Sequence, residues 1–150
     1  MSSLLAALQG IDLDSGVGTF PKNQTEAVKA ALLYRAGKWE QAHKIAQGIP
    51  SSEGSFWHAI LHRTEGDWEN AAYWFRQVGD HPIYPLIYAD AVQILAVRTH
   101  SDWDAGNQWD PFEFVRWCKA ASLLPGSAEE NIVNQIQVSE WRHLFSWCAR

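Results

Sequence analysis

The sequence contains few cysteines, no long hydrophobic run and no excess of positive charge. Its two cysteines, Cys118 and Cys148, are too few for a disulfide framework and form no CxxC metal motif. Every apolar run is far shorter than the roughly 18–20 residues that span a bilayer. Twelve Lys and Arg residues against 17 Asp and Glu residues give a formal net charge of -5 without a basic block. Neither nucleic acid nor a membrane is therefore expected as a partner.

Motifs of the common catalytic classes are also missing. The sequence has no G-x-S-x-G string, no phosphate-binding glycine loop and no paired cysteines, so no catalytic residue is assigned and enzyme activity is not favoured. Residues 1–10 contain no Lys or Arg and do not resemble a secretory signal, which favours the cytoplasm. Apolar residues still make up 47% of the 150 residues, enough for one folded domain over residues 1–150.

Helical periodicity dominates the chain, and no stretch alternates apolar and polar residues as a strand would. The expected fold class is therefore all-α. Glycines, prolines and capping residues predict loops over 11–21 and 98–110. The predicted helices cover residues 3–9, 25–36, 38–47, 56–65, 67–78, 84–97, 111–123 and 127–148.

The central part of the chain contains an internal repeat. The string GKWEQA begins at Gly37 and the string GDWENA begins at Gly66, an offset of 29 residues. Each string starts where one predicted helix ends and the next begins. The order helix, glycine turn, helix therefore occurs twice within residues 25–82.

This pattern resembles the tetratricopeptide-type helical repeat. In that family a small residue packs at the centre of the first helix, Gly-x-aromatic-x-x-Ala opens the second, an aromatic residue follows and a proline closes the unit. The second unit matches this pattern at Ala59, Gly66, Trp68, Ala71, Phe75 and Pro82. The first unit matches at Gly37, Trp39, Ala42 and Pro50 and has Ala46 in place of the aromatic. The offset of 29 is shorter than the 34 residues usual for the family.

The resemblance implies TPR-like antiparallel helix pairs, about two repeats within residues 25–82, closed by additional C-terminal helices within 84–148. It also implies a non-enzymatic protein that binds a protein or peptide in a concave groove. The residues that fall on the groove face are Glu53, Phe56, Ile60 and Arg63. Arg63 beside an aromatic ring suits a peptide carboxylate, but the favoured interpretation is a local ion pair with Asp67. The added helices could also fill the groove, and the last helix could form a homodimer.

The stretch from Phe56 to Pro82 also resembles an uncharacterised bacterial protein family. That resemblance implies no activity, cofactor or partner.

Two histidines one helical turn apart give a second hypothesis. The spacing of His58 and His62 places both imidazoles on one helix face and suits zinc or another divalent metal. The favoured third ligand is His81, because the helix that precedes it can fold back beside the first. Other candidates are Asp80, Glu65 and Asp67. On this hypothesis the chain is a metal- or small-molecule-binding protein, or an enzyme, centred on His58, His62, His81 and the neighbouring Arg63.

The favoured alternative is that His58 and His62 are hydrogen-bonded core residues and that no cofactor is bound. The remaining histidines are expected to face solvent or to cap helices, and they are His43, His100 and His143. Two of the nine tryptophans, Trp103 and Trp109, lie in a predicted loop rich in carboxylates and amides. Such loops bind sugars or cations, but the favoured interpretation is that the rings fold the loop onto the core.

Overall fold

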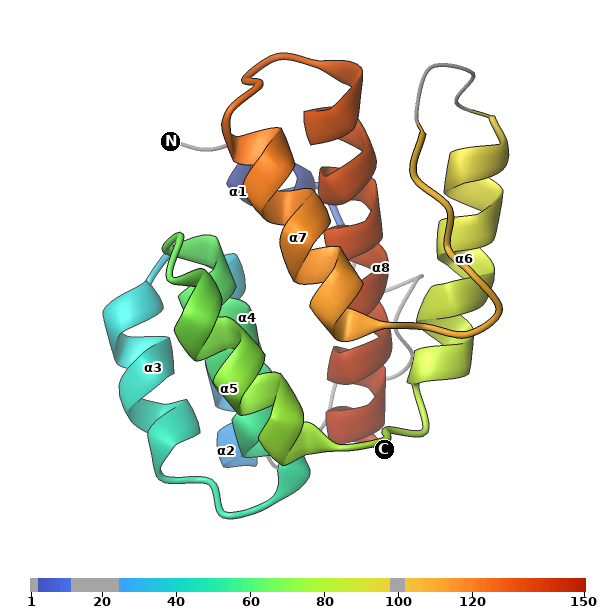
Figure 1. Cartoon of the computed structure of the whole chain (residues 1–150). Coiled ribbons are helices and arrows are strands. Elements are labelled where there is room, and N and C mark those ends of the chain that lie inside the picture. Colours follow the sequence, from blue (N-terminus) through green and yellow to red (C-terminus); the bar gives the residue numbers. More distant parts are fainter. Residues whose placement is uncertain (1–2, 12–24, 98–101) are drawn as a thin grey trace.

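The computed structural model describes residues 3–11, 25–97 and 102–150. Within these ranges the chain forms eight α-helices and no strand, which confirms the expected all-α class (Figure 1). The helices are α1 (Ser3–Gln9), α2 (Glu26–Arg35), α3 (Trp39–Gln47), α4 (Ser52–Thr64), α5 (Trp68–Val78), α6 (Tyr84–Ala96), α7 (Pro111–Ser122) and α8 (Ala128–Ala149). Of the predicted loops, residues 12–21 and 98–101 lie outside the described ranges. None of the helices within those ranges is both long and apolar enough to cross a bilayer.

The repeated string produces the same turn twice. Gly37 and Gly66 both have a φ of 81°, a left-handed conformation that glycine adopts without a Cβ clash. In the first turn the N–H of Lys38 donates to the carbonyl of Leu33, and in the second the N–H of Asp67 donates to that of His62, each at 2.9 Å. This is the hydrogen bond of a helix-ending Schellman turn. The offset of 29 residues therefore corresponds to two helix hairpins, α2–α3 and α4–α5.

Small side chains allow the helices of each hairpin to approach closely. Ala30 and Ala42 in the first hairpin, and Ala59 and Ala71 in the second, are fully buried. Helix α4 begins at Ser52, earlier than predicted, because the carbonyl of Ser51 already accepts the N–H groups of residues 54 and 55.

Helix α8 is the central element of the C-terminal half. It contacts α1, α2, α6 and α7, and Figure 1 shows it running lengthwise between α7 and α6. The predicted helix starts are confirmed: Ser127 Oγ accepts the N–H of Glu130, and Asp110 Oδ1 accepts the N–H groups of residues 112 and 113. The apolar face of α8 is buried at Ile132, Val133, Ile136, Trp141, Leu144 and Phe145.

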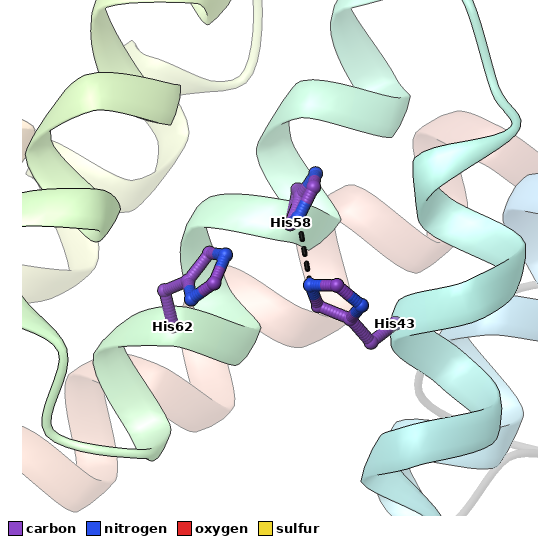
Figure 2. Close-up of side chains that lie close together, drawn as sticks. All are labelled: His43, His58 and His62. Atoms are coloured by element: carbon purple, nitrogen blue, oxygen red, sulfur yellow. Dashed lines mark hydrogen bonds between the residues drawn. The ribbon is translucent and has the colours of Figure 1, made fainter.

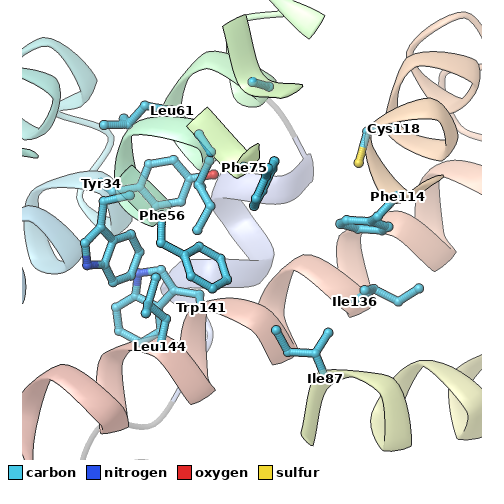
Figure 3. Close-up of a cluster of buried hydrophobic side chains, with 14 of the residues drawn as sticks. Tyr34, Phe56, Leu61, Phe75, Ile87, Phe114, Cys118, Ile136, Trp141 and Leu144 are labelled. Carbon is cyan, nitrogen blue, oxygen red and sulfur yellow. The ribbon is translucent and has the colours of Figure 1, made fainter. Parts of the chain in front are cut away.

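Most of the face predicted to line a groove is buried. Phe56 and Ile60 are buried in the core cluster that also contains Trp141 and Leu144 of α8 (Figure 3). The alternative that the added helices fill this face is the one the structure shows.

Arg63 occupies neither of the positions considered for it. Its side chain is 2% exposed and points into the core, where it donates to Glu140 at 2.5 and 3.0 Å and to Gln137 at 3.3 Å. The ring of Phe114 lies 4.9 Å from the guanidinium carbon. The buried partner on α8 satisfies this charge, so the local pair with Asp67 does not form.

Candidate metal centre

Three histidines from two helices meet on the surface between the two hairpins. His43 comes from α3, and His58 and His62 come from α4 (Figure 2). The Nε2 atoms of His43 and His58 are 2.8 Å apart, and one ligand atom from each of the three rings lies within 4.8 Å of the others. The three imidazoles are therefore close enough to hold one metal ion.

The helical spacing and the packing of α3 on α4 bring these rings together. His58 and His62 are one turn apart, and their rings stack with centroids at 4.9 Å and an interplanar angle of 18°. His43 meets both rings edge-on, with centroids 4.4 Å from His58 and 5.2 Å from His62. Helix α3 thus supplies one ring across the interface from the two rings of α4.

A tryptophan on α5 forms one wall of the cluster. The rings of Trp74 and His58 stack with centroids at 4.0 Å and an interplanar angle of 19°. His58 is only 4% exposed, whereas the side chain of His62 is 15% exposed and His43 is half-buried. His58 therefore lies in the interior, and His43 and His62 reach solvent.

The environment keeps the rings of α4 in the neutral form that binds metals. Burial, together with His43 and His62, lowers the pKa of His58 from 6.5 to about 4. Burial and His43 also lower the pKa of His62, and the carboxylates of Asp67 and Glu65 only partly oppose this. Each imidazole therefore has one unprotonated ring nitrogen at neutral pH.

Two carboxylates lie just outside the cluster. Asp67 Oδ2 is 3.8 Å and Glu65 Oε2 is 4.0 Å from Nδ1 of His62, longer than a hydrogen bond. That Nδ1 atom is buried and has no hydrogen-bond partner among the described residues. Hydrogen bonds from Asn70 lower the pKa of Asp67, so this carboxylate is ionised and can orient the His62 ring.

The spacing of the nitrogens fits zinc after a small rearrangement. Zinc binds imidazole nitrogen at about 2.0–2.1 Å, which places two ligands of a tetrahedral site about 3.3 Å apart. The observed separations, from 2.8 Å to at most 4.8 Å, lie on both sides of that value. The three rings therefore lie close to the spacing that one zinc ion requires.

The third histidine differs from the one the sequence favoured. His81 lies outside the cluster: its Nε2 is 3.0 Å from Oε2 of Glu53, and its Nδ1 accepts the N–H of Ile83. The reason is the antiparallel course of α5. A residue that follows α5 lies level with the beginning of α4, whereas His58 and His62 lie further along that helix.

The sequence-based ligand set omits His43 because it takes all of its ligands from one helix pair. In a stack of hairpins, the second helix of one pair packs on the first helix of the next, as α3 packs on α4. The signal available in the sequence is that His43 directly follows Ala42, the last residue of the first repeat string. Of the other single histidines, His143 lies 2.8 Å from Asp90, and His100 is outside the described residues.

The tryptophans of the second predicted loop pack onto the core, as the favoured interpretation expects. Trp103 stacks on Trp117 with centroids at 5.2 Å, and Trp109 lies 5.2 Å from Phe114.

Comparisons of the chain with protein-family models, curated proteins and solved structures find no match.

Proposed function

We propose that the protein binds a divalent transition metal ion, zinc in the first instance, through His43, His58 and His62. The observation that carries the proposal is the convergence of three imidazoles from two helices within 4.8 Å. A nitrogen-only ligand set suits zinc, copper or nickel and does not suit calcium or magnesium, which prefer oxygen ligands.

The cluster supplies three protein ligands. Among the described residues, no further His, Cys, Asp or Glu belongs to the cluster. Three protein ligands plus a water molecule or another small ligand complete a tetrahedral zinc site. A metal in this position ties α3 of the first hairpin to α4 of the second and stabilises the folded chain, by more the tighter it binds.

A protein or peptide partner, a homodimer and a cytoplasmic location remain predictions of the sequence. The residues expected to grip a peptide do not support that partner, because Phe56 and Arg63 are buried in the core. The half-buried Glu53 is engaged with His81 and Ser52.

The test is a calorimetric zinc titration of untagged protein first stripped with a chelator. We expect one zinc per chain, and we expect His43→Gln, His58→Gln and His62→Gln each to weaken binding by more than about 100-fold, since even outer-shell changes cost 10–100-fold. His143→Gln is the matched control. His81→Gln tests the ligand set expected from the sequence, and zinc binding by this variant should match that of the unaltered chain. Undetectable zinc binding, or equal binding by the His43→Gln variant, would overturn the proposal.

A further inference from the structure

Helix α6 presents an apolar face to solvent. It packs on α8, and its buried residues are Tyr84, Ile87 and Ala91. Figure 1 shows it at the edge of the molecule, beside α8 and the loop that precedes α7. Seven residues of α6 and its C-cap are exposed, and at 3.6 residues per turn they share an arc of roughly 140°. Six of the seven are apolar: Pro85, Leu86, Ala89, Val92, Ala96 and Val97.

This face differs from that of an ordinary surface helix such as α3. The exposed residues of α3 are all polar, and they are Glu40, Gln41, Lys44 and Gln47. On α6 and at its C-cap, Leu86 is 50% exposed, Val92 is 41% exposed and Val97 is 74% exposed. Contiguous exposed apolar surface is characteristic of a site that another molecule covers.

A groove of about 590 Å³ runs beside this face, between α6 and the loop before α7. Its apolar and aromatic lining residues are Tyr84, Pro85, Tyr88, Trp109, Pro111 and Phe112. Pro85 belongs to both the exposed face and the groove, so the two surfaces are continuous. The hydroxyl of Tyr88 donates to the carbonyl of Gly106 at 2.7 Å and ties the loop to α6. The exposed face and the groove together form one apolar surface, called here the α6 surface.

Carboxylates border the α6 surface on the side of the loop. Asp80 lines the groove, and Asp104 and Asp110 line an adjoining hollow that shares Trp109 with it. Residues 102–110 contain three aspartates and neither lysine nor arginine. An apolar groove with a carboxylate edge is complementary to a molecule that is apolar on one face and positively charged along the border of that face.

We propose that the α6 surface binds a basic amphipathic helix of a partner protein. Such a helix has apolar side chains at i, i+3, i+4 and i+7, and this stripe fits an apolar face with a groove beside it. Its lysines and arginines face the aspartates of the loop. The opposite side of α6 has mixed charge, because Arg142 lines the hollow there together with Asp90 and His143. The basic residues of the partner are therefore expected along one edge of its apolar stripe.

A second copy of the chain and a membrane fit this surface less well. Among the described residues that line the groove and the two hollows next to it, Arg142 is the single lysine or arginine. A second copy would therefore bring one cation to several carboxylates. An anionic bilayer is repelled by the same carboxylates.

The test measures the fluorescence anisotropy of a labelled synthetic peptide of about 18 residues, long enough to form a helix, with leucine on one face and lysine along one edge. The full chain is titrated into the peptide with chelator present, so that metal binding plays no part. We expect saturable binding that weakens as salt is added. Leu86→Gln and Val92→Gln should each weaken it by about fivefold to tenfold, because each removes an apolar side chain that is already about half buried.

Leu123→Gln is the matched control. Leu123 is an exposed leucine at the far end of α7 from the groove, so its replacement should leave binding unchanged. All three substituted side chains are exposed, and the three variants should keep the thermal midpoint of the unaltered chain. Asp80→Asn should weaken binding by about twofold, the value of one exposed ion pair.

Four results would each overturn the proposal. The first is that a peptide with glutamate in place of lysine binds as tightly as the lysine peptide. The second is that Leu86→Gln and Val92→Gln bind as well as Leu123→Gln. The third is a dimer in sedimentation velocity that Val92→Gln dissociates, which would assign the surface to a second copy. The fourth is binding of the chain to phosphatidylcholine vesicles and not to the peptide.

Discussion

The Nε2 atoms of His43 and His58 lie 2.8 Å apart and join the second helix of one hairpin to the first helix of the next. One nitrogen must carry a hydrogen and donate it, and the other must accept the hydrogen bond. A metal ion held by both Nε2 atoms would replace this hydrogen bond, and the ring that donated it would then carry its proton on Nδ1. Metal binding through these two nitrogens therefore requires the hydrogen bond between His43 and His58 to break.

The histidine cluster should make the metal-free protein less stable in mild acid. The pKa of His58 is about 4 in the folded chain against an ordinary 6.5, so the unfolded state binds more protons between these values. Stability is fully present above pH 6.5 and is lost as the pH falls toward 4. We expect this histidine to contribute a loss on the order of 1 kcal/mol, moderated by solvent screening.

Urea unfolding of chelator-treated protein at several pH values in this window measures the effect. The His58→Gln variant removes the titrating group and provides the control. Identical pH profiles for the variant and the unaltered chain would show that His58 does not titrate as described.

The buried ion pair between Arg63 and Glu140 should dominate the electrostatic stability of the chain. Both side chains are almost fully buried, so Glu140→Gln leaves an unpaired buried charge. We expect unfolding free energy to fall by about 3–5 kcal/mol. Glu26→Gln breaks an exposed pair with Lys29 and should cost less than about 1 kcal/mol. Similar losses in the two variants, measured by urea unfolding, would contradict this account.

The turn glycines of the repeat should not tolerate a side chain. Gly66 has a φ of 81°, and a Cβ there would meet only Trp68 at 3.8 Å, so the cost of Gly66→Ala comes from the backbone alone. We expect a loss of about 1–2 kcal/mol. Gly48 ends α3 at a φ of -87° and is the matched control. Gly48→Ala should be neutral or slightly stabilising. Equal thermal midpoints for the two variants would refute the role of the left-handed turn.

The fold class and the repeat followed from the sequence because helix periodicity, glycine turns and caps are local signals. Helix starts at Asp110 and Ser127 were predictable for the same reason. The position of the Arg63 side chain was not predictable. Its partner Glu140 lies 77 residues away, on a helix whose placement no local pattern reveals. His58 and His62 were predictable from their spacing, whereas His43 depended on how the hairpins stack.

The two cysteines should be unreactive in the folded chain. Both thiols are free, Cys118 is buried, and burial raises the pKa of each to about 12. Thiols react as thiolates, so a disulfide reagent should label neither at neutral pH until the chain is unfolded. Rapid labelling of the native protein, quantified by mass spectrometry, would contradict the burial described here.

The most direct test of the central claim is X-ray absorption spectroscopy of the protein after zinc loading and dialysis. The account predicts retained zinc with nitrogen scatterers at about 2.0–2.1 Å and the outer-shell pattern of three imidazoles, reduced to fewer in the His43→Gln variant. Zinc lost on dialysis, a sulfur shell at about 2.3 Å, or an imidazole count unchanged in that variant would contradict it.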